Sequence, residues 1–131
     1  MRKRIAFDQS RGRISSHPMK QERSLIIGAS GGIGAALADA MEQRGAVVRL
    51  SRSADGLDLT DEASIQRVLG MQSGTFDQIV IATGALQIGT AAPEKTIRAI
   101  DPQALAAQFA LNAIGPALVL KHILPLVPRN R

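Results

Sequence analysis

The chain has 131 residues, of which 45% are hydrophobic and none is cysteine. This length and composition fit one domain with a real core, while the lack of cysteine excludes disulfides, zinc–thiolate sites and a cysteine nucleophile. The net charge of +5 arises in residues 1–23, and aromatic residues make up only 2% of the chain, so nucleic acid is not an expected partner. The two histidines, His17 and His122, lie in unrelated contexts, and no metal site is predicted.

Residues 1–23 mix Arg, Ser, Gln and Pro without an apolar period and predict a mobile basic tail before a domain over 24–131. Met19 stands just before the first predicted strand, and a translation start there would make residues 1–18 an over-extension of the reading frame. An Arg-rich targeting peptide is the alternative. Because the start lacks the apolar region of a secretory signal, the cytoplasm is the expected compartment.

Residues 25–34 run from Leu-Ile-Ile into a glycine-rich turn. The apolar run predicts a strand buried on both faces, followed by a helix. Gly28 permits the tight turn, Gly32 lets N–H groups approach a pyrophosphate, and Gly34 lets the helix pack on the strand. The positive end of the helix would face the phosphates of a dinucleotide. A loop that merely connects the two elements is the alternative. The predicted binding residues are Gly28, Ser30, Gly31, Gly32, Ile33 and Gly34.

The helix after this turn is expected to end at Gly45 as a C-cap glycine, and residues 46–51 predict a second strand. Strand, helix and strand form one βαβ unit with a right-handed crossover. At the end of the second strand, the Arg52 fork suits a 2′-phosphate and Ser51 or Ser53 adds a hydroxyl, which favours NADP over NAD as the cofactor. The alternative is a solvated surface arginine, partly neutralised by Asp55.

Leu57–Asp61 follows, where Thr60 or Asp61 is expected to cap the next helix. The linker from Ser51 to Asp58 is too short for a helix, so the chain should pass almost directly into a further short strand. A helix over 63–71 and a strand over 76–82 with a doubly buried end come next.

Residues 86–100 are expected to form a loop, and Asp101-Pro102 then starts a long helix. Gly115-Pro116 should kink or loosen this helix. We expect no membrane span, because no run of 18 apolar residues is uninterrupted. His122 is expected to be exposed near the helix end. The order of elements predicts a doubly wound parallel sheet, the Rossmann-type α/β class with three α/β/α layers.

The spacing Gly28-x-x-x-Gly32-x-Gly34 resembles that of the short-chain dehydrogenase/reductase family, with Ile27 where the family usually has Thr. The resemblance covers residues 24 to about 128 and extends to small C-factor-like members at 82–86, 92–95 and 112–117. It implies adenine contacts for Asp58 and Leu59, backbone contacts to the cofactor for Ala82, Thr83 and Gly84, and a proton-relay water held by Asn112. Ile81 and Ala82 replace the two Asn of the family. A structural Asn buried at a kinked backbone is the alternative for position 112.

In this family, hydride transfer between nicotinamide and a small-molecule carbonyl or alcohol uses Tyr, Lys and usually Ser, yet this sequence contains no tyrosine. We expect the cofactor-binding half of such an oxidoreductase, cut short by a frameshift, a stop or an artificial boundary, and inactive alone. The last helix and the edge of the 76–82 strand would then be uncovered, which predicts a homo-oligomer through the last helix. The alternative is a non-catalytic NADP-binding or interaction module that acts as a dimer or with a partner.

Overall fold

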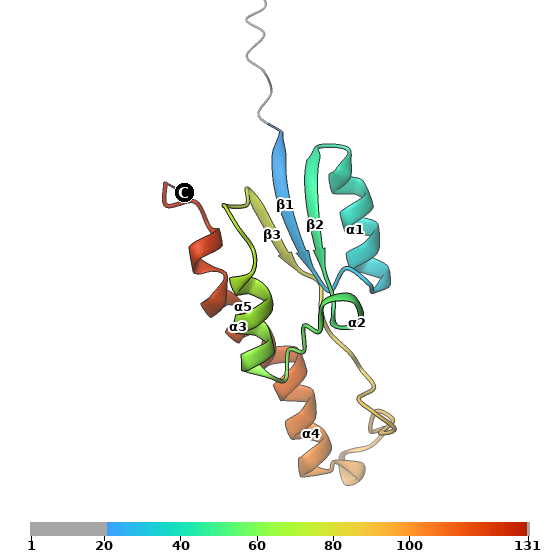
Figure 1. The fold of residues 1–131 in the computed structure, drawn as a ribbon. Coiled ribbons are helices and arrows are strands. Elements are labelled where there is room, and N and C mark those ends of the chain that lie inside the picture. Colours follow the sequence, from blue (N-terminus) through green and yellow to red (C-terminus); the bar gives the residue numbers. More distant parts are fainter. Residues whose placement is uncertain (1–20, 131) are drawn as a thin grey trace, which may run out of the picture.

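The computed structural model describes residues 21–130, which form a three-stranded parallel sheet flanked by helices (Figure 1). The strands are β1 (Glu22–Ile27), β2 (Gly45–Leu50) and β3 (Gln78–Ile81), in the order β2-β1-β3. The central position of β1 explains its apolar sequence, because it is paired on both sides: Leu25 stands opposite Val48 on β2 and opposite Ile79 on β3.

The helices lie on both faces of this sheet. They are α1 (Gly32–Glu42), α2 (Arg52–Asp55), α3 (Glu62–Gly70), α4 (Pro102–Phe109) and α5 (Gly115–His122). Ile26 packs toward Ala38 of α1, whereas Leu25 and Ile27 belong to a larger core with side chains of α3 and α5. The alternation of β1 side chains between the two faces confirms the predicted doubly wound, three-layer α/β/α arrangement.

The boundary of the predicted tail was wrong at its last two residues, because β1 begins at Glu22. Arg23 is held by a segment 50 or more residues away: its guanidinium donates to the Ser73 and Thr75 carbonyls at 2.7 and 3.2 Å and lies 4.1 Å from the centre of the Phe76 ring. The charged side chain of Arg23 therefore serves a tertiary contact of the domain and does not mark a tail residue. Residues 1–20, with the proposed start at Met19, lie outside the described residues.

The predictions for the β1–β2 and β2–α3 connections need three corrections. Gly45 does not cap α1 but is the first residue of β2, where a Cβ would collide with the backbone of Glu22 on the neighbouring strand. The linker after Ser51 does contain a helix, the single turn α2, because the Ser51 hydroxyl accepts a hydrogen bond from Ala54 N. Residues 57–61 contain a turn at 59–60 and no strand.

The strand β3 is only half-buried, which corrects the predicted doubly buried end. It pairs with β1 alone among the described strands, so it lies at an edge of the sheet. The segment after it, through residue 100, has no long element and contains one short 3₁₀ turn at Ile97–Ala99, as the composition predicted.

The long helix begins as predicted, with the Asp101 carboxylate accepting from Ala104 N and Pro102 at the first helical position. It continues through a π-helical segment (Ala110–Ile114) into α5, and this segment is the expected loosening before Pro116. Figure 1 shows α4 projecting beyond the sheet, while α5 packs on α3. A last 3₁₀ turn, Leu124–Leu126, follows.

Within the described part of the chain, the continuous helical run Pro102–His122 is long and apolar enough to cross a membrane, judged by length and composition alone. Only 11% of its most apolar window is buried. Val119 is fully buried in the larger core, and Asn112 bonds the loop after β3.

Candidate functional site

The glycine turn after β1 has the backbone geometry that its sequence predicted. Gly28 has φ +90°, and a Cβ there would lie 2.6 Å from the carbonyl oxygen of Ala82, so a side chain would require the two segments to separate. A Cβ at Gly34 would collide with the Gly28 carbonyl. The turn also holds the end of β2, because Gly28 N and Ala29 N both donate to the Leu50 carbonyl.

The N-terminus of α1 is open to a ligand. No side chain caps it at Gly31, and Gly32 and Ile33 are exposed. A Cβ at Gly32 would meet no atom within 4 Å. The N–H groups of the first turn therefore face free space, which is the arrangement that binds anionic groups at helix N-termini.

A pocket of about 350 Å³ opens beside this turn, at the carboxyl ends of all three strands. It brings together most of the predicted binding residues: Gly28, Ser30, Gly31, Ser51, Arg52, Asp58, Leu59, Ala82, Thr83 and Gly84. Gly32, Ile33 and Gly34 form the first turn of α1 and do not line the pocket, and Asn112 is also absent from the lining.

The lining includes five further residues that the sequence analysis did not assign: Leu57, Thr60, Ala85, Ile88 and Leu111. Leu57, Thr60 and Ala85 directly adjoin assigned residues, so widening each assigned segment by one residue would have found them. Ile88 and Leu111 come from the loop after β3 and from the π-helical segment, and no local pattern marks them.

At the end of β2, Arg52 carries an exposed guanidinium beside the pocket. Among residues 21–130 it takes part in no ion pair. Asp55 does not neutralise it at contact distance, because the Asp55 carboxylate instead accepts from Ser51 N at 2.7 Å. The Ser51 hydroxyl is committed to capping α2, so Arg52 is the group of this turn that is free to meet an anion.

Asp58 lines the same pocket and lies in a locally bonded turn. Its Oδ1 accepts from Thr60 N at 2.9 Å and from Thr60 Oγ1 at 2.7 Å. The Thr60 hydroxyl, then the Thr60 amide and the charge of Arg52, hold the pKa of Asp58 below its usual value, so the side chain remains a carboxylate. Asp61 caps α3 by accepting from Ala63 N, as predicted.

The segment after β3 forms the floor of the pocket. Thr83 lines it, and the Thr83 hydroxyl is buried without a hydrogen-bond partner. Asn112 holds this segment through both of its amide atoms: Oδ1 accepts from Ala85 N at 3.0 Å and Nδ2 donates to the Ala85 carbonyl at 2.9 Å. The alternative of a buried Asn is wrong, because Asn112 is exposed and bridges two segments.

Comparisons with solved structures match this arrangement. A small-chain dehydrogenase superposes with a TM-score of 0.70 at 25% identity, over 83% of this chain and 50% of its own. The chain resembles part of a short-chain dehydrogenase/reductase. A small-chain dehydrogenase in complex with NADPH gives a TM-score of 0.68 at 25% identity, over 83% of this chain and 47% of its own. The Listeria innocua protein lin1944 gives a TM-score of 0.68 at 24% identity, over 82% of this chain and 51% of its own.

These likenesses confirm the resemblance to short-chain dehydrogenases and the Rossmann-type fold expected from the sequence. The chain spans about half the length of these solved structures. No protein-family model matches the sequence, and no curated protein is significantly similar to it.

Proposed function

We propose that this chain binds NADP as the cofactor-binding part of a short-chain oxidoreductase, whose reaction moves a hydride between nicotinamide and a carbonyl or alcohol substrate. The observation that carries the proposal is the single pocket shared by Gly28, Arg52 and Thr83 at the carboxyl ends of β1, β2 and β3. In open α/β sheets, ligands bind outside these strand ends.

The residues present fit a dinucleotide. Because Gly28 and Gly31 carry no side chain, the turn leaves room before the uncapped α1 N-terminus, where a pyrophosphate would accept hydrogen bonds from backbone N–H groups. The unpaired Thr83 hydroxyl adds a polar group at the floor. When bound, the cofactor supplies the hydride chemistry, and the protein supplies orientation and electrostatics.

In this proposal, each group of lining residues contacts a different part of the cofactor. The Arg52 guanidinium would hold the 2′-phosphate that distinguishes NADP from NAD. The Asp58 carboxylate and the Leu59 side chain would receive the adenine. Asn112 orients Ala85 and thereby the segment that carries Thr83 and Gly84. Because both of its amide atoms are engaged in this bridge, we propose a positioning role for Asn112 in place of a side-chain water relay.

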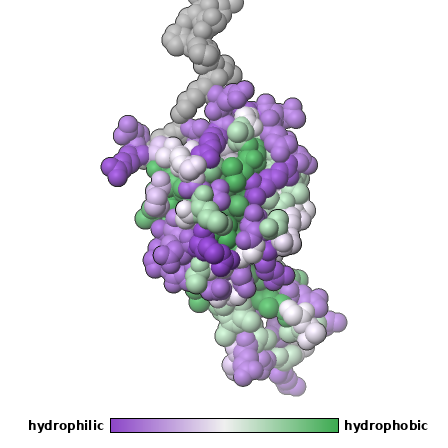
Figure 2. Space-filling view, in the orientation of Figure 1, coloured by the Kyte–Doolittle hydropathy of each residue, from purple (hydrophilic) through white to green (hydrophobic). Residues whose placement is uncertain are grey.

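A second candidate is a non-catalytic NADP-binding module that works as a homo-oligomer. Two observations favour it: the sequence contains no tyrosine to act as the acid or base, and the long helix and its following turn expose Leu105, Phe109, Ile114, Leu120 and Leu124. Figure 2 shows hydrophobic colours at the surface over the projecting end of the molecule, where α4 lies. Exposed apolar surface of this extent marks interaction sites.

Calorimetric titration of the chain with NADPH and NADH tests the proposal. The unmodified chain should prefer NADPH, and Arg52→Ala should weaken NADPH binding roughly 10- to 100-fold while leaving NADH binding unchanged. Gly32→Val should weaken both ligands, because its side chain enters space that is open in the fold but needed by phosphates. Arg98→Ala, at another exposed arginine, is the matched control. Equal affinity for the two cofactors would overturn the NADP assignment, and binding of neither would overturn the dinucleotide site.

A further inference from the structure

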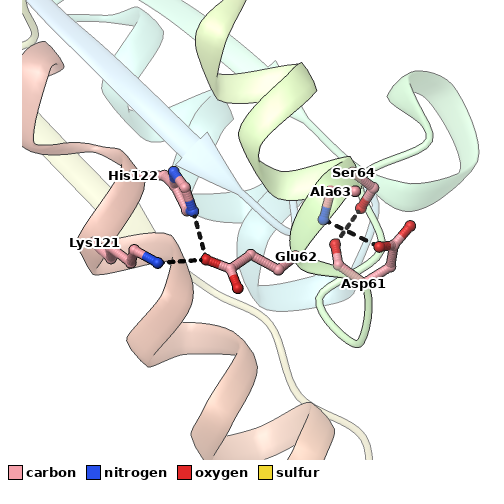
Figure 3. Close-up of polar contacts among 6 residues, drawn as sticks. All are labelled: Asp61, Glu62, Ala63, Ser64, Lys121 and His122. Carbon is pink, nitrogen blue, oxygen red and sulfur yellow. Dashed lines mark hydrogen bonds and ion pairs between the residues drawn. The ribbon is translucent and has the colours of Figure 1, made fainter.

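Residues 57–60 line one part of the pocket and are here called the pocket wall. Ser64 is buried behind this wall and forms hydrogen bonds with its backbone. It is the third residue of α3 and is 3% exposed. Its hydroxyl oxygen accepts from Asp58 N at 2.9 Å and lies 2.8 Å from the Asp58 carbonyl oxygen, to which it donates. The same hydroxyl lies 2.9 Å from the Asp61 carbonyl oxygen, a contact drawn in Figure 3. One side chain thus engages both backbone polar groups of Asp58.

These bonds fix the position of the wall relative to α3. Asp58 precedes Leu59, which is 5% exposed and lines the pocket from the larger core. The Asp58 side chain is oriented separately, by the two bonds from Thr60 to Oδ1. Ser64 therefore sets where the backbone of the wall stands, and Thr60 sets how the carboxylate is turned.

The wall offers a carboxylate oxygen as a hydrogen-bond acceptor next to apolar side chains. No hydrogen bond to Asp58 Oδ2 forms within the described residues, and Leu57 and Leu59 flank it along the pocket lining. A carboxylate accepts but does not donate. This combination suits a flat base with an exocyclic amine, and it disfavours a base that presents a carbonyl oxygen at the same place.

We propose that Ser64 is a positioning residue that gives this pocket its preference for adenine over a purine with a carbonyl at that position. The inference rests on the proposed function, because it concerns the adenine end of the same dinucleotide site. Ser64 does not line the pocket and acts through the backbone of Asp58.

The test compares NADPH with its hypoxanthine analogue, which replaces the amine of adenine by a carbonyl. A loss of folded protein weakens both apparent affinities by the same factor, so the ratio of the two dissociation constants is independent of stability. The unmodified chain should prefer NADPH, and Ser64→Ala should reduce this preference roughly 2- to 10-fold. A merely structural serine would leave the ratio unchanged.

A matched pair of variants separates the hydroxyl from the volume of the side chain. Ser64→Thr should keep the preference and Ser64→Val should lose it, while Ser73→Ala, at an exposed serine after α3, should leave it unchanged. If neither hydroxyl-free variant folds, the hydroxyl serves stability and the proposal is wrong. An unchanged ratio in Ser64→Ala, or no base preference in the unmodified chain, also overturns it while NADPH binding stands. Failure of the unmodified chain to bind NADPH removes the proposed function itself, and this inference with it.

Discussion

Gly115 of α5 lies against Leu59 of the pocket wall, with no room for a side chain between them. A Cβ at Gly115 would come within 2.7 Å of both Leu59 Cβ and the Leu59 carbonyl oxygen. The helix that follows the π-helical segment therefore supports the wall that Ser64 fixes from α3. Gly115 is therefore needed for this close packing, as well as for the loosening of the helix before Pro116.

Gly115→Ala should destabilise the fold and weaken NADPH binding together. The added methyl has to displace Leu59 or α5, and overpacking of this kind costs about 1–3 kcal/mol of unfolding free energy. Urea unfolding and cofactor titration measure the two effects. Gly70→Ala is the control, because a Cβ at Gly70 would meet no atom within 4 Å and that helix should tolerate it. Equal stability of the two variants would contradict the tight contact.

Asn112→Ala should release the segment after β3. Ala85 N would lose its acceptor and the Ala85 carbonyl its donor, which should lower the unfolding free energy by about 1–3 kcal/mol and speed amide exchange at Ala85. Asn112→Asp should be no better, because a carboxylate oxygen would then face the Ala85 carbonyl. Gln87→Ala, at an exposed neighbouring position, should leave exchange at Ala85 unaltered. Unchanged protection of Ala85 in Asn112→Ala would refute the bridge.

The sequence predicted what depends on local backbone chemistry and on strand order. The glycine turn follows from the conformational needs of Gly28 and Gly34, and the shared pocket follows because parallel strands present their carboxyl ends at one edge. The capping of α3 by Asp61 and the start of α4 at Asp101 were equally local. Such features need only a few neighbouring residues.

Three of the errors concern residues whose partners are distant in sequence, whereas the turn α2 was missed although its cap, between Ser51 and Ala54, is local. In the sequence Arg23 resembles a tail residue, but in the fold it contacts the α3–β3 connection. Gly45 resembles a helix cap, but the backbone of Glu22 on the paired strand determines it. His122 was expected to be exposed, yet its side chain is 18% exposed because it contacts Glu62 of α3. No local period or spacing carries these contacts.

Glu62 joins α3 to α5, and its contribution should depend on pH. Its Oε1 lies 2.7 Å from Lys121 Nζ and 2.9 Å from His122 Nε2 (Figure 3). Lys121, followed by His122, lowers the pKa of Glu62 below its ordinary value of 4.5. A pKa lowered by folding stabilises the fold above the unfolded value, and this stabilisation is lost as the pH falls through the folded value.

Glu62→Gln should therefore reduce the urea midpoint slightly near neutral pH, since exposed ion pairs are weak, and the difference should vanish below the lowered pKa. Unfolding curves recorded across the acid range measure this convergence. Glu94→Gln, at an exposed glutamate, should show no such pH-dependent difference. A Glu62→Gln effect that persists in strong acid would indicate lost packing rather than a lost ion pair.

Association through the long helix should depend on its exposed apolar side chains. Phe109 and Leu120 are 58% and 55% exposed, and burying such a side chain contributes about 1.5–3 kcal/mol. We expect the chain to sediment as a homo-oligomer, with Phe109→Ser and Leu120→Ser each raising the dissociation constant roughly tenfold or more. Met71→Ser removes an apolar side chain that is at least as exposed, at the end of α3, and should leave association unchanged. A monodisperse monomer at all concentrations would refute the proposed oligomer, whereas an oligomer that Phe109→Ser and Leu120→Ser leave unweakened would place the contact elsewhere.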